Sequence, residues 1–122
     1  MKGTKKLGIL GAVLLPAAIL CLVVLTRERW DDRVIAQSKQ TGEQILDAID
    51  RYYADHGQVP VSLRALVPNY LPRVDPPTAG SRKWCYVRLG DSNCELTFGC
   101  GDDMYPAYYV QRVRRPNWDY SH

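Results

Sequence analysis

The sequence predicts an α+β fold in which a long N-terminal transmembrane and amphipathic helix packs against a small three-stranded antiparallel sheet. Three observations predict it. Near the start, 19 consecutive residues carry no charged or strongly polar side chain. The next stretch repeats small and apolar residues at helical spacing, and the second half of the chain alternates apolar and polar residues as strands do. A chain of 122 residues has room for one modest domain beyond such a helix.

The distribution of charge argues against a nucleic-acid-binding protein. The 16 Lys and Arg exceed the 13 Asp and Glu by three, and Lys2, Lys5 and Lys6 account for that excess. In the rest of the chain Arg and Asp are interspersed, whereas phosphate neutralisation needs a basic stripe. We therefore expect no nucleic-acid partner.

Residues 7–25 form the predicted transmembrane helix. At about 1.5 Å per residue these 19 residues span about 28 Å, which is close to the hydrocarbon thickness of a bilayer. A cleaved signal peptide is an alternative, but its apolar region runs to roughly 7–15 residues and ends in small residues, whereas this run ends in the sequence VVLTR, 23–27. Lipidation of Cys21 is a further alternative, which the large Leu20 before it disfavours. We expect an uncleaved anchor.

Charge counting alone does not orient this segment, since Arg27, Arg29 and Arg33 balance the three lysines before it. Those arginines are interleaved with acidic residues, and the three cysteines that follow suit an oxidising compartment. We therefore predict a cytoplasmic basic tail at residues 1–6 and a domain of residues 26–122 on the other side of the membrane.

Residues 31–56 are predicted to form the long helix. Only the half from Ile45 onward has apolar side chains large enough to pack against a sheet, so we expect the first half to be a solvated stalk or a surface for a neighbouring helix. Small or apolar residues recur at spacings of four and three along one side: Val34, Ser38, Thr41, Ile45, Ala48 and Tyr52. The other side is charged and is predicted to face water: Asp32, Lys39, Glu43, Asp47, Asp50 and Asp55.

The end of this helix is predicted from Gly57 and Pro60. Glycine favours the left-handed position after a helix, and proline prevents the helix from resuming. A short helix is expected at residues 62–67, with Ser62 as its cap and Pro68 closing it.

The run AIDRYYADHGQVP at 48–60, followed by SLRALVPNYL at 62–71, resembles the type II secretion pseudopilins and type IV pilin-like proteins. In that family the assembly helix ends in a tyrosine-rich turn, and a Gly-x-x-Pro step, a short helix and a proline-rich crossing lead into a small antiparallel sheet. The resemblance covers residues 1 to about 90 in layout and 45–77 in detail. It implies a bacterial inner-membrane protein with a periplasmic domain, whose partners are the lipid bilayer and other pilin-like or secretion-apparatus proteins.

The chain departs from that family in its first residues. The family carries a leader ending in glycine, then a phenylalanine-led helix with an acidic residue at its fifth position. Here Gly3, Gly8 and Gly11 are followed by no such pattern, and no acidic residue precedes Glu28.

The sheet is predicted from residue 83 onward, where aromatic and β-branched residues alternate with polar ones. We expect strands at 83–89, 94–99 and 107–113, the first two joined by a turn at 90–93. The tail after Arg114 forms either an edge strand or a loose end.

Three cysteines follow the membrane segment, so at most one disulfide forms within the chain. The predicted turn pairs Cys85 with Phe98, and a bulge or shift near Gly99 brings Cys85 and Cys100 within bonding distance. Cys94 with Cys100 is the second candidate.

The predicted core consists of the large apolar residues that face the helix–sheet boundary. They are Ile45, Ile49, Tyr52, Leu63, Leu66, Leu71, Val87, Leu96 and Phe98.

The residue pattern favours no chemical site. The later cysteines are nine and six residues apart, unlike the paired spacing of zinc ligands. Asp102 and Asp103 suit calcium or an ordinary solvated turn, and neither His56 nor His122 has a nucleophile nearby in the sequence. We expect no catalytic residue, metal, cofactor or small-molecule substrate, and hence no enzyme.

A basic cluster near the end of the chain is either a polar rim or a contact patch for an acidic partner. It consists of Arg112, Arg114 and Arg115. The leading functional hypothesis is a membrane-anchored structural or assembly subunit of a secretion or pilus-type apparatus. The alternative is a stand-alone single-pass envelope protein whose exterior domain binds a peptide, a glycan or a partner protein.

Overall fold

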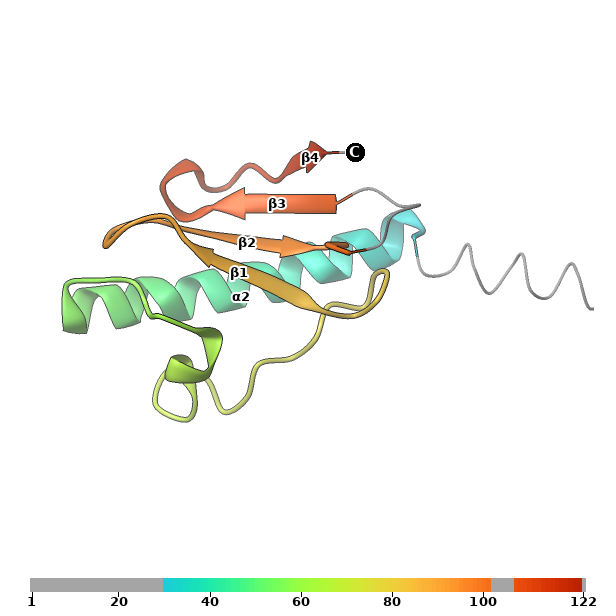
Figure 1. The fold of residues 1–122 in the computed structure, drawn as a ribbon. Helices are drawn as coiled ribbons and strands as arrows, with labels where there is room; N and C mark the ends of the chain where they lie inside the picture. Colours follow the sequence, from blue (N-terminus) through green and yellow to red (C-terminus); the bar gives the residue numbers. More distant parts are fainter. Residues whose placement is uncertain (1–29, 102–106, 122) are drawn as a thin grey trace, which may run out of the picture.

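The computed structural model describes residues 30–101 and 107–121, and it shows one long helix with an antiparallel sheet along one side (Figure 1). The predicted basic tail, 1–6, and the predicted transmembrane helix, 7–25, lie outside the described residues. Within those described ranges, no helix is long and apolar enough to cross a membrane. The elements are α2 (Asp32–His56), η1 (Leu63–Leu66), β1 (Trp84–Arg88), β2 (Cys94–Phe98), β3 (Ala107–Gln111), η2 (Arg112–Arg114) and β4 (Asp119–Ser121).

Helix α2 begins and ends at residues suited to its termini. The Asp31 carboxylate accepts a hydrogen bond from the Val34 N–H at 3.0 Å, and Asp32 places a second negative charge in the first turn. Gly57 adopts a left-handed φ of 74° and donates its N–H to the Tyr53 carbonyl at 2.8 Å. These local interactions explain why the observed bounds lie within one residue of the predicted 31–56. Asp31 itself is extended, with a ψ of 162°, and Trp30 before it is not helical, so the prediction that the amphipathic helix continues without a break from the transmembrane helix is wrong.

One side of the first half of α2, at Ser38 and Gly42, is buried within the domain, so the expectation that this half is a solvated stalk or a surface for another helix is wrong. Ser38 is 0% exposed, and its Oγ accepts hydrogen bonds from the N–H groups of Thr78 and Ala79 at 3.1 and 3.0 Å. The same hydroxyl donates to the Val34 carbonyl at 2.9 Å. Small residues are needed at these positions because the 78–79 backbone lies directly on the helix at Ser38, and the rings of two tryptophans lie on it at Gly42.

Gly42 makes room for two of those rings, and Gly42→Ala is expected to lower the free energy of unfolding by about 1 kcal/mol net. The added methyl would lie 2.6 Å from Cη2 of Trp118 and 3.1 Å from Cη2 of Trp84. Overpacking typically costs about 1–3 kcal/mol, and only about 1 kcal/mol of this is offset by the better helix propensity of alanine.

Urea unfolding of the two proteins measures the difference. Gln44→Ala, at an exposed position on the same helix, is the matched control and is expected to change stability by less than about 0.5 kcal/mol. A Gly42→Ala protein at least as stable as the wild type would show that the Trp118 ring moves aside freely.

The segment between α2 and the sheet turns back at Gly57 and runs along the helix. Pro60 is buried, and its carbonyl accepts a hydrogen bond from the Tyr86 hydroxyl at 2.5 Å. The short helix is a 3₁₀ turn over Leu63–Leu66, ending one residue before the predicted 67. Ser62 makes no side-chain capping bond there, so its predicted capping role is wrong. A single 3₁₀ turn leaves fewer amide groups for a cap to satisfy than an α-helix does.

The sheet has four strands in the order β1-β2-β3-β4, one more than predicted (Figure 1). The extra strand, β4, pairs Tyr109 with Asp119 and Ala107 with Ser121. At three residues it is too short to show a period-2 pattern. The predicted third strand ends at Gln111, two residues early, because the chain enters the 3₁₀ turn η2 there.

The register of the β1–β2 hairpin differs by one residue from the prediction. Cys94 pairs with Arg88, and Cys85 pairs with Thr97. The loop is therefore residues 89–93, and it closes through the Leu89 N–H, which donates to the Asn93 carbonyl at 2.9 Å. Turn residues alone did not reveal that Leu89 belongs to the loop.

The core lies between α2, η1 and the inner face of the sheet. Val87 was predicted to belong to it, which is wrong, since its side chain is 48% exposed. Trp84 and Tyr86 pack against the core, so the alternation of a strand turns Val87 to the opposite face. Five of the other predicted core residues are at most 2% exposed: Ile45, Ile49, Leu66, Leu96 and Phe98. The remaining three are partly buried and pack against the core: Tyr52, Leu63 and Leu71.

Candidate functional site

The predicted arginine patch is held largely by carboxylates of the same chain. Arg112 Nε donates to Asp50 Oδ1 at 2.6 Å, and its Nη1 donates to the Ser92 carbonyl at 2.6 Å. Its guanidinium also lies 4.1 Å from the centroid of the Tyr53 ring. The Arg112 side chain is only 18% exposed.

Arg115 contacts three carboxylates on one side of α2. Its Nη2 lies 2.9 Å from Glu43 Oε2 and 2.6 Å from Asp47 Oδ1, and its Nη1 contacts Asp50. Burial lowers the pKa of Arg115, but the hydrogen bonds that its guanidinium donates to Asp47 and Glu43 raise it, and the net shift is upward. The guanidinium therefore remains charged throughout the working pH range.

We name these five residues the Arg–carboxylate cluster: Glu43, Asp47, Asp50, Arg112 and Arg115. The prediction that this side of α2 faces water is wrong for Lys39, Glu43 and Asp50, which are partly buried. Trp118 extends the cluster by donating its indole N–H to Glu43 Oε1 at 3.0 Å. Spacings of four and three place the three acids on one face of the helix. This acidic face, together with the run of arginines near the end of the chain, was the sequence signal for the cluster, and the pairing of the two was not predicted.

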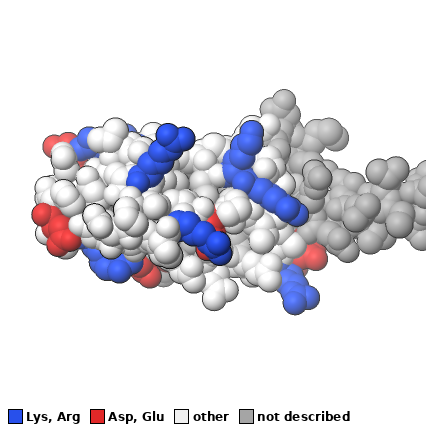
Figure 2. Space-filling model, turned by 90° about the horizontal axis from the view of Figure 1, so that it is seen from below, with Lys and Arg blue, Asp and Glu red and all other residues white. Residues whose placement is uncertain are grey.

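Arg114 is the exposed member of the predicted patch. Other cations are spread over the surface of the 57–83 segment, where Arg64, Arg73, Arg82 and Lys83 are exposed and Asp75 pairs with Arg73 at 2.8 Å. Figure 2 shows Lys and Arg side chains at several places on one face, with fewer Asp and Glu among them. A spread of this kind gives no focused anion site.

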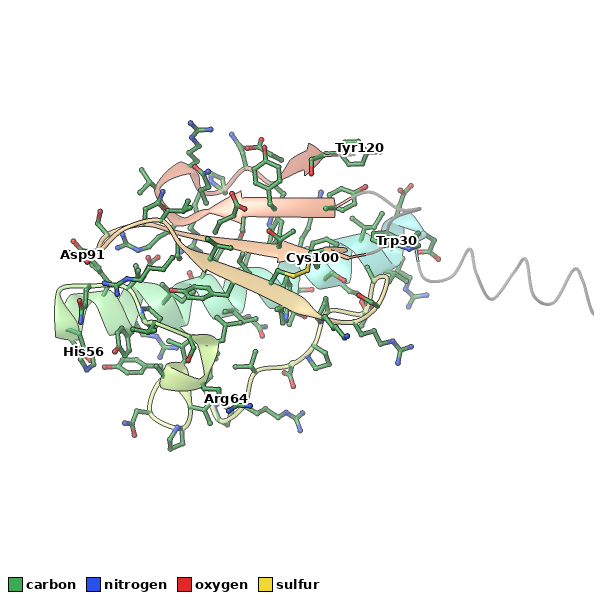
Figure 3. The ribbon with its side chains drawn as sticks, viewed as in Figure 1. Trp30, His56, Arg64, Asp91, Cys100 and Tyr120 are labelled. Carbon is green, nitrogen blue, oxygen red and sulfur yellow. A yellow bond between two sulfur atoms is a disulfide. The ribbon has the colours of Figure 1, made fainter. Side chains whose placement is uncertain are left out.

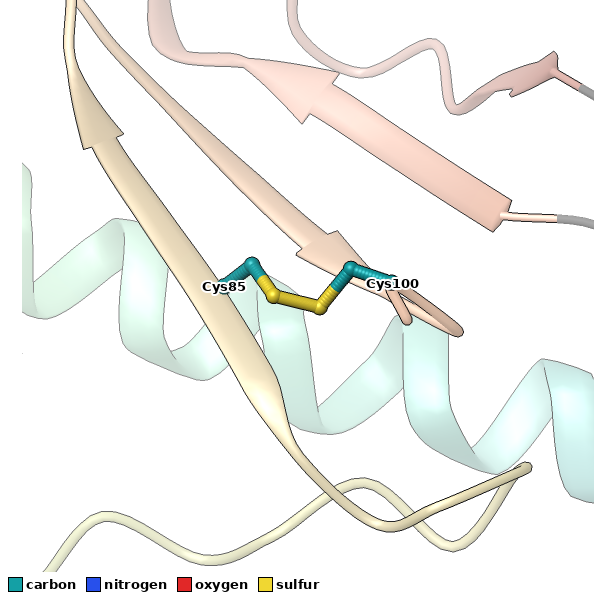
Figure 4. Close-up of a disulfide and its surroundings, with 2 residues drawn as sticks. All are labelled: Cys85 and Cys100. Carbon is teal, nitrogen blue, oxygen red and sulfur yellow. A yellow bond between two sulfur atoms is a disulfide. The ribbon is translucent and has the colours of Figure 1, made fainter. Parts of the chain in front are cut away.

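Cys85 and Cys100 form a disulfide, as predicted, and the second candidate, Cys94 with Cys100, is wrong (Figure 4). Their Cα atoms are 6.4 Å apart. Gly99 and Gly101 take positive φ values of 85° and 83°, which turns the chain after β2 and brings Cys100 back beside β1. The expected irregularity near Gly99 is therefore the feature that permits the bond.

Cys94 is a free thiol in the core and is 0% exposed. Burial raises its pKa from the usual 9.0 to about 11, although a hydrogen bond with Tyr86 and the charge of Arg112 oppose the rise. Burial is also the main reason why the pKa of the Tyr86 phenol is raised. A protonated, enclosed thiol is a packing group rather than a nucleophile.

Stability is expected to fall as the pH rises above about 9, because of Cys94. A thiol with a raised pKa in the folded state contributes its full stabilisation below the unfolded pKa and loses it as the pH approaches the folded value of about 11. Urea unfolding at pH values between about 7 and 10.5 measures this slope. Cys94→Ala is expected to have a shallower slope, and an unchanged slope would contradict the assignment to Cys94.

Of the remaining sites considered from the sequence, only His56 lies in the described residues, and His122 lies outside them. Nδ1 of His56 lies 3.0 Å from the Tyr52 carbonyl, and its ring stacks on Tyr52 at 4.0 Å between centroids. Asp102 and Asp103 lie outside the described residues. Within the described parts of the chain, no group of three or more His, Cys, Asp or Glu is placed to hold a metal ion.

No protein-family model, no curated protein and no solved structure matches this chain.

Proposed function

We propose that this chain is a membrane-anchored, pilin-like structural or assembly subunit of a bacterial secretion or pilus-type apparatus. In this proposal residues 7–25 cross the inner membrane, residues 1–6 lie in the cytoplasm, and the domain stands in the periplasm. We assign it no catalytic role.

The observation that carries the proposal is the layout of α2. The helix starts at Asp32, and only six residues separate it from the apolar segment that ends at Leu25. A meander of four consecutive strands then lies along one side of this single 25-residue helix. An apolar segment that shortly precedes a long helix and a one-layer sheet has the order that the pilin-like resemblance implies, although α2 begins after a break at Asp31.

The environment of the cysteines agrees with a domain outside the cytoplasm. The bond between Cys85 and Cys100 is of a kind that persists in oxidising compartments and is rare where thiols are kept reduced. It therefore supports the periplasmic side of the membrane as the location of the domain.

Anchoring is tested with the full-length chain in a Gram-negative host. We expect the wild type to stay in the membrane pellet after alkaline carbonate and to be digested by protease added to spheroplasts. Leu15→Arg is the matched variant, since a charge at the centre of the span costs about 2.5–3.5 kcal/mol in insertion. Wild-type protein released by carbonate would contradict the anchor.

The assembly role is tested by deleting the gene and measuring secretion and pilus-dependent activity. Loss of either activity, restored by the wild type but not by Leu15→Arg, is the expected result. Unchanged secretion and pilus activity with altered binding of an envelope ligand would overturn this role in favour of a stand-alone binding module.

A further inference from the structure

Three aromatic side chains close one end of the domain. The ring centroids of Trp30 and Tyr108 are 6.5 Å apart, and those of Tyr108 and Tyr120 are 5.3 Å apart. Figure 3 shows Trp30 and Tyr120 at the same end of the molecule, with His56 and Asp91 at the opposite end. We name Trp30, Tyr108 and Tyr120 the aromatic end.

The chemistry of this end suits a boundary between water and hydrocarbon. Tyr120 is 49% exposed, and Trp30 and Tyr108 are partly buried. Each ring combines an apolar body with one polar atom, the combination that concentrates Trp and Tyr at the headgroup level of membranes. The ammonium of Lys39 lies 5.0 Å from the Tyr108 ring centroid and adds a cation on a long apolar stem.

Chain length brings the aromatic end close to the proposed membrane span. Residues 26–29 alone separate Leu25 from Trp30. Five steps reach at most about 17 Å when extended and about 7.5 Å when helical. The interfacial layer on each side of the hydrocarbon is about 5–8 Å thick, so a helical or folded-back connection places Trp30 within this layer, whereas a fully extended one would carry it beyond.

We propose that the aromatic end lies in the phospholipid headgroup layer and seats the domain on the membrane surface. This inference rests on the proposed function, since it requires residues 7–25 to span the bilayer. Charges of both signs surround the aromatic end, with Asp31 and Asp32 beside Arg33. Contact therefore depends on the rings rather than on anionic lipid, and neutral phosphatidylcholine is a sufficient partner.

The test uses the full-length chain in phosphatidylcholine nanodiscs. Ser121→Cys, next to Tyr120, and Asp91→Cys, at the opposite end, each carry an environment-sensitive fluorophore in a Cys21→Ser background. Both positions are exposed, while Cys94 is buried and the other two cysteines are bonded. Lipid with a nitroxide on its headgroup is expected to quench the label at 121 by about half or more and to leave the label at 91 nearly unchanged.

Variants of Tyr120 separate a contact made by the ring from mere proximity. Tyr120→Asn is expected to reduce quenching at 121 by about half, and Tyr120→Trp to preserve it. Equal quenching at 121 and 91 overturns the inference, as does quenching that requires anionic lipid and disappears in high salt.

Failure of this inference is distinguishable from failure of the proposed function. If the protein resists carbonate extraction yet shows no quenching at 121, the proposed membrane anchor stands and only the proposed contact between the aromatic end and the membrane is rejected. If carbonate releases the protein, both the membrane anchor and the membrane contact of the aromatic end are rejected.

Discussion

Replacing Cys85 and Cys100 together by alanine is expected to lower the free energy of unfolding by about 3 kcal/mol. The bond closes a loop with a sequence separation of 15 residues, and constraining a loop of that length in the unfolded chain is worth about 3 kcal/mol. For a domain of this size the change corresponds to a fall in melting temperature of roughly 15 °C. Thermal unfolding of the full-length chain in detergent, followed by tryptophan fluorescence, measures it.

Reductant provides the control for this prediction. Dithiothreitol is expected to lower the melting temperature of the wild type to that of the double variant and to leave the variant unchanged. Equal melting temperatures for the oxidised wild type and the variant would contradict the stabilising role of the bond.

Arg115→Ala is expected to lower the free energy of unfolding by about 2 kcal/mol. The change removes charge-assisted hydrogen bonds, of which one contributes about 1.5–3 kcal/mol, and it leaves the carboxylates of Glu43, Asp47 and Asp50 without their shared cation. Exposure of Asp47 reduces the effect, since its side chain is 66% exposed and therefore well solvated. Urea unfolding at neutral pH measures the difference.

Arg114→Ala is the matched control, because it removes the same side chain from the exposed neighbouring position. It is expected to change stability by less than about 0.5 kcal/mol. The stability loss of Arg115→Lys is expected to lie between those of Arg114→Ala and Arg115→Ala, since an ammonium keeps the charge but cannot reproduce the fork geometry of the guanidinium. Equal effects of Arg114→Ala and Arg115→Ala would show that the cluster contributes nothing to folding.

Features encoded by neighbouring residues were predictable from the sequence. The bounds of α2 follow from Asp31 and Gly57, whose effects act within one helical turn. The α+β class follows from the change of period along the chain, and the bond between Cys85 and Cys100 follows from an approximate hairpin register together with Gly99.

Features that depend on contacts distant in sequence were not predictable in the same way. Burial of Ser38 comes from hydrogen bonds to a segment 40 residues away, and Gly42 is small because Trp84 and Trp118 cover it. The first half of α2 therefore looked too polar to be covered. The Arg–carboxylate cluster was missed for the same reason, since its ion pairs join residues 62 to 72 positions apart.

Helix α2 is held to the rest of the domain by contacts at several positions along its length, and this has a mechanical consequence. A pulling force that enters the domain at Trp30 is carried along the helix axis. Ser38 ties the helix to the 78–79 backbone, Gly42 lies beneath two indole rings, and Arg115 holds its acidic face farther along. Tension applied at this end of α2 is therefore shared among several contacts along the helix, and α2 resists being pulled away from the sheet.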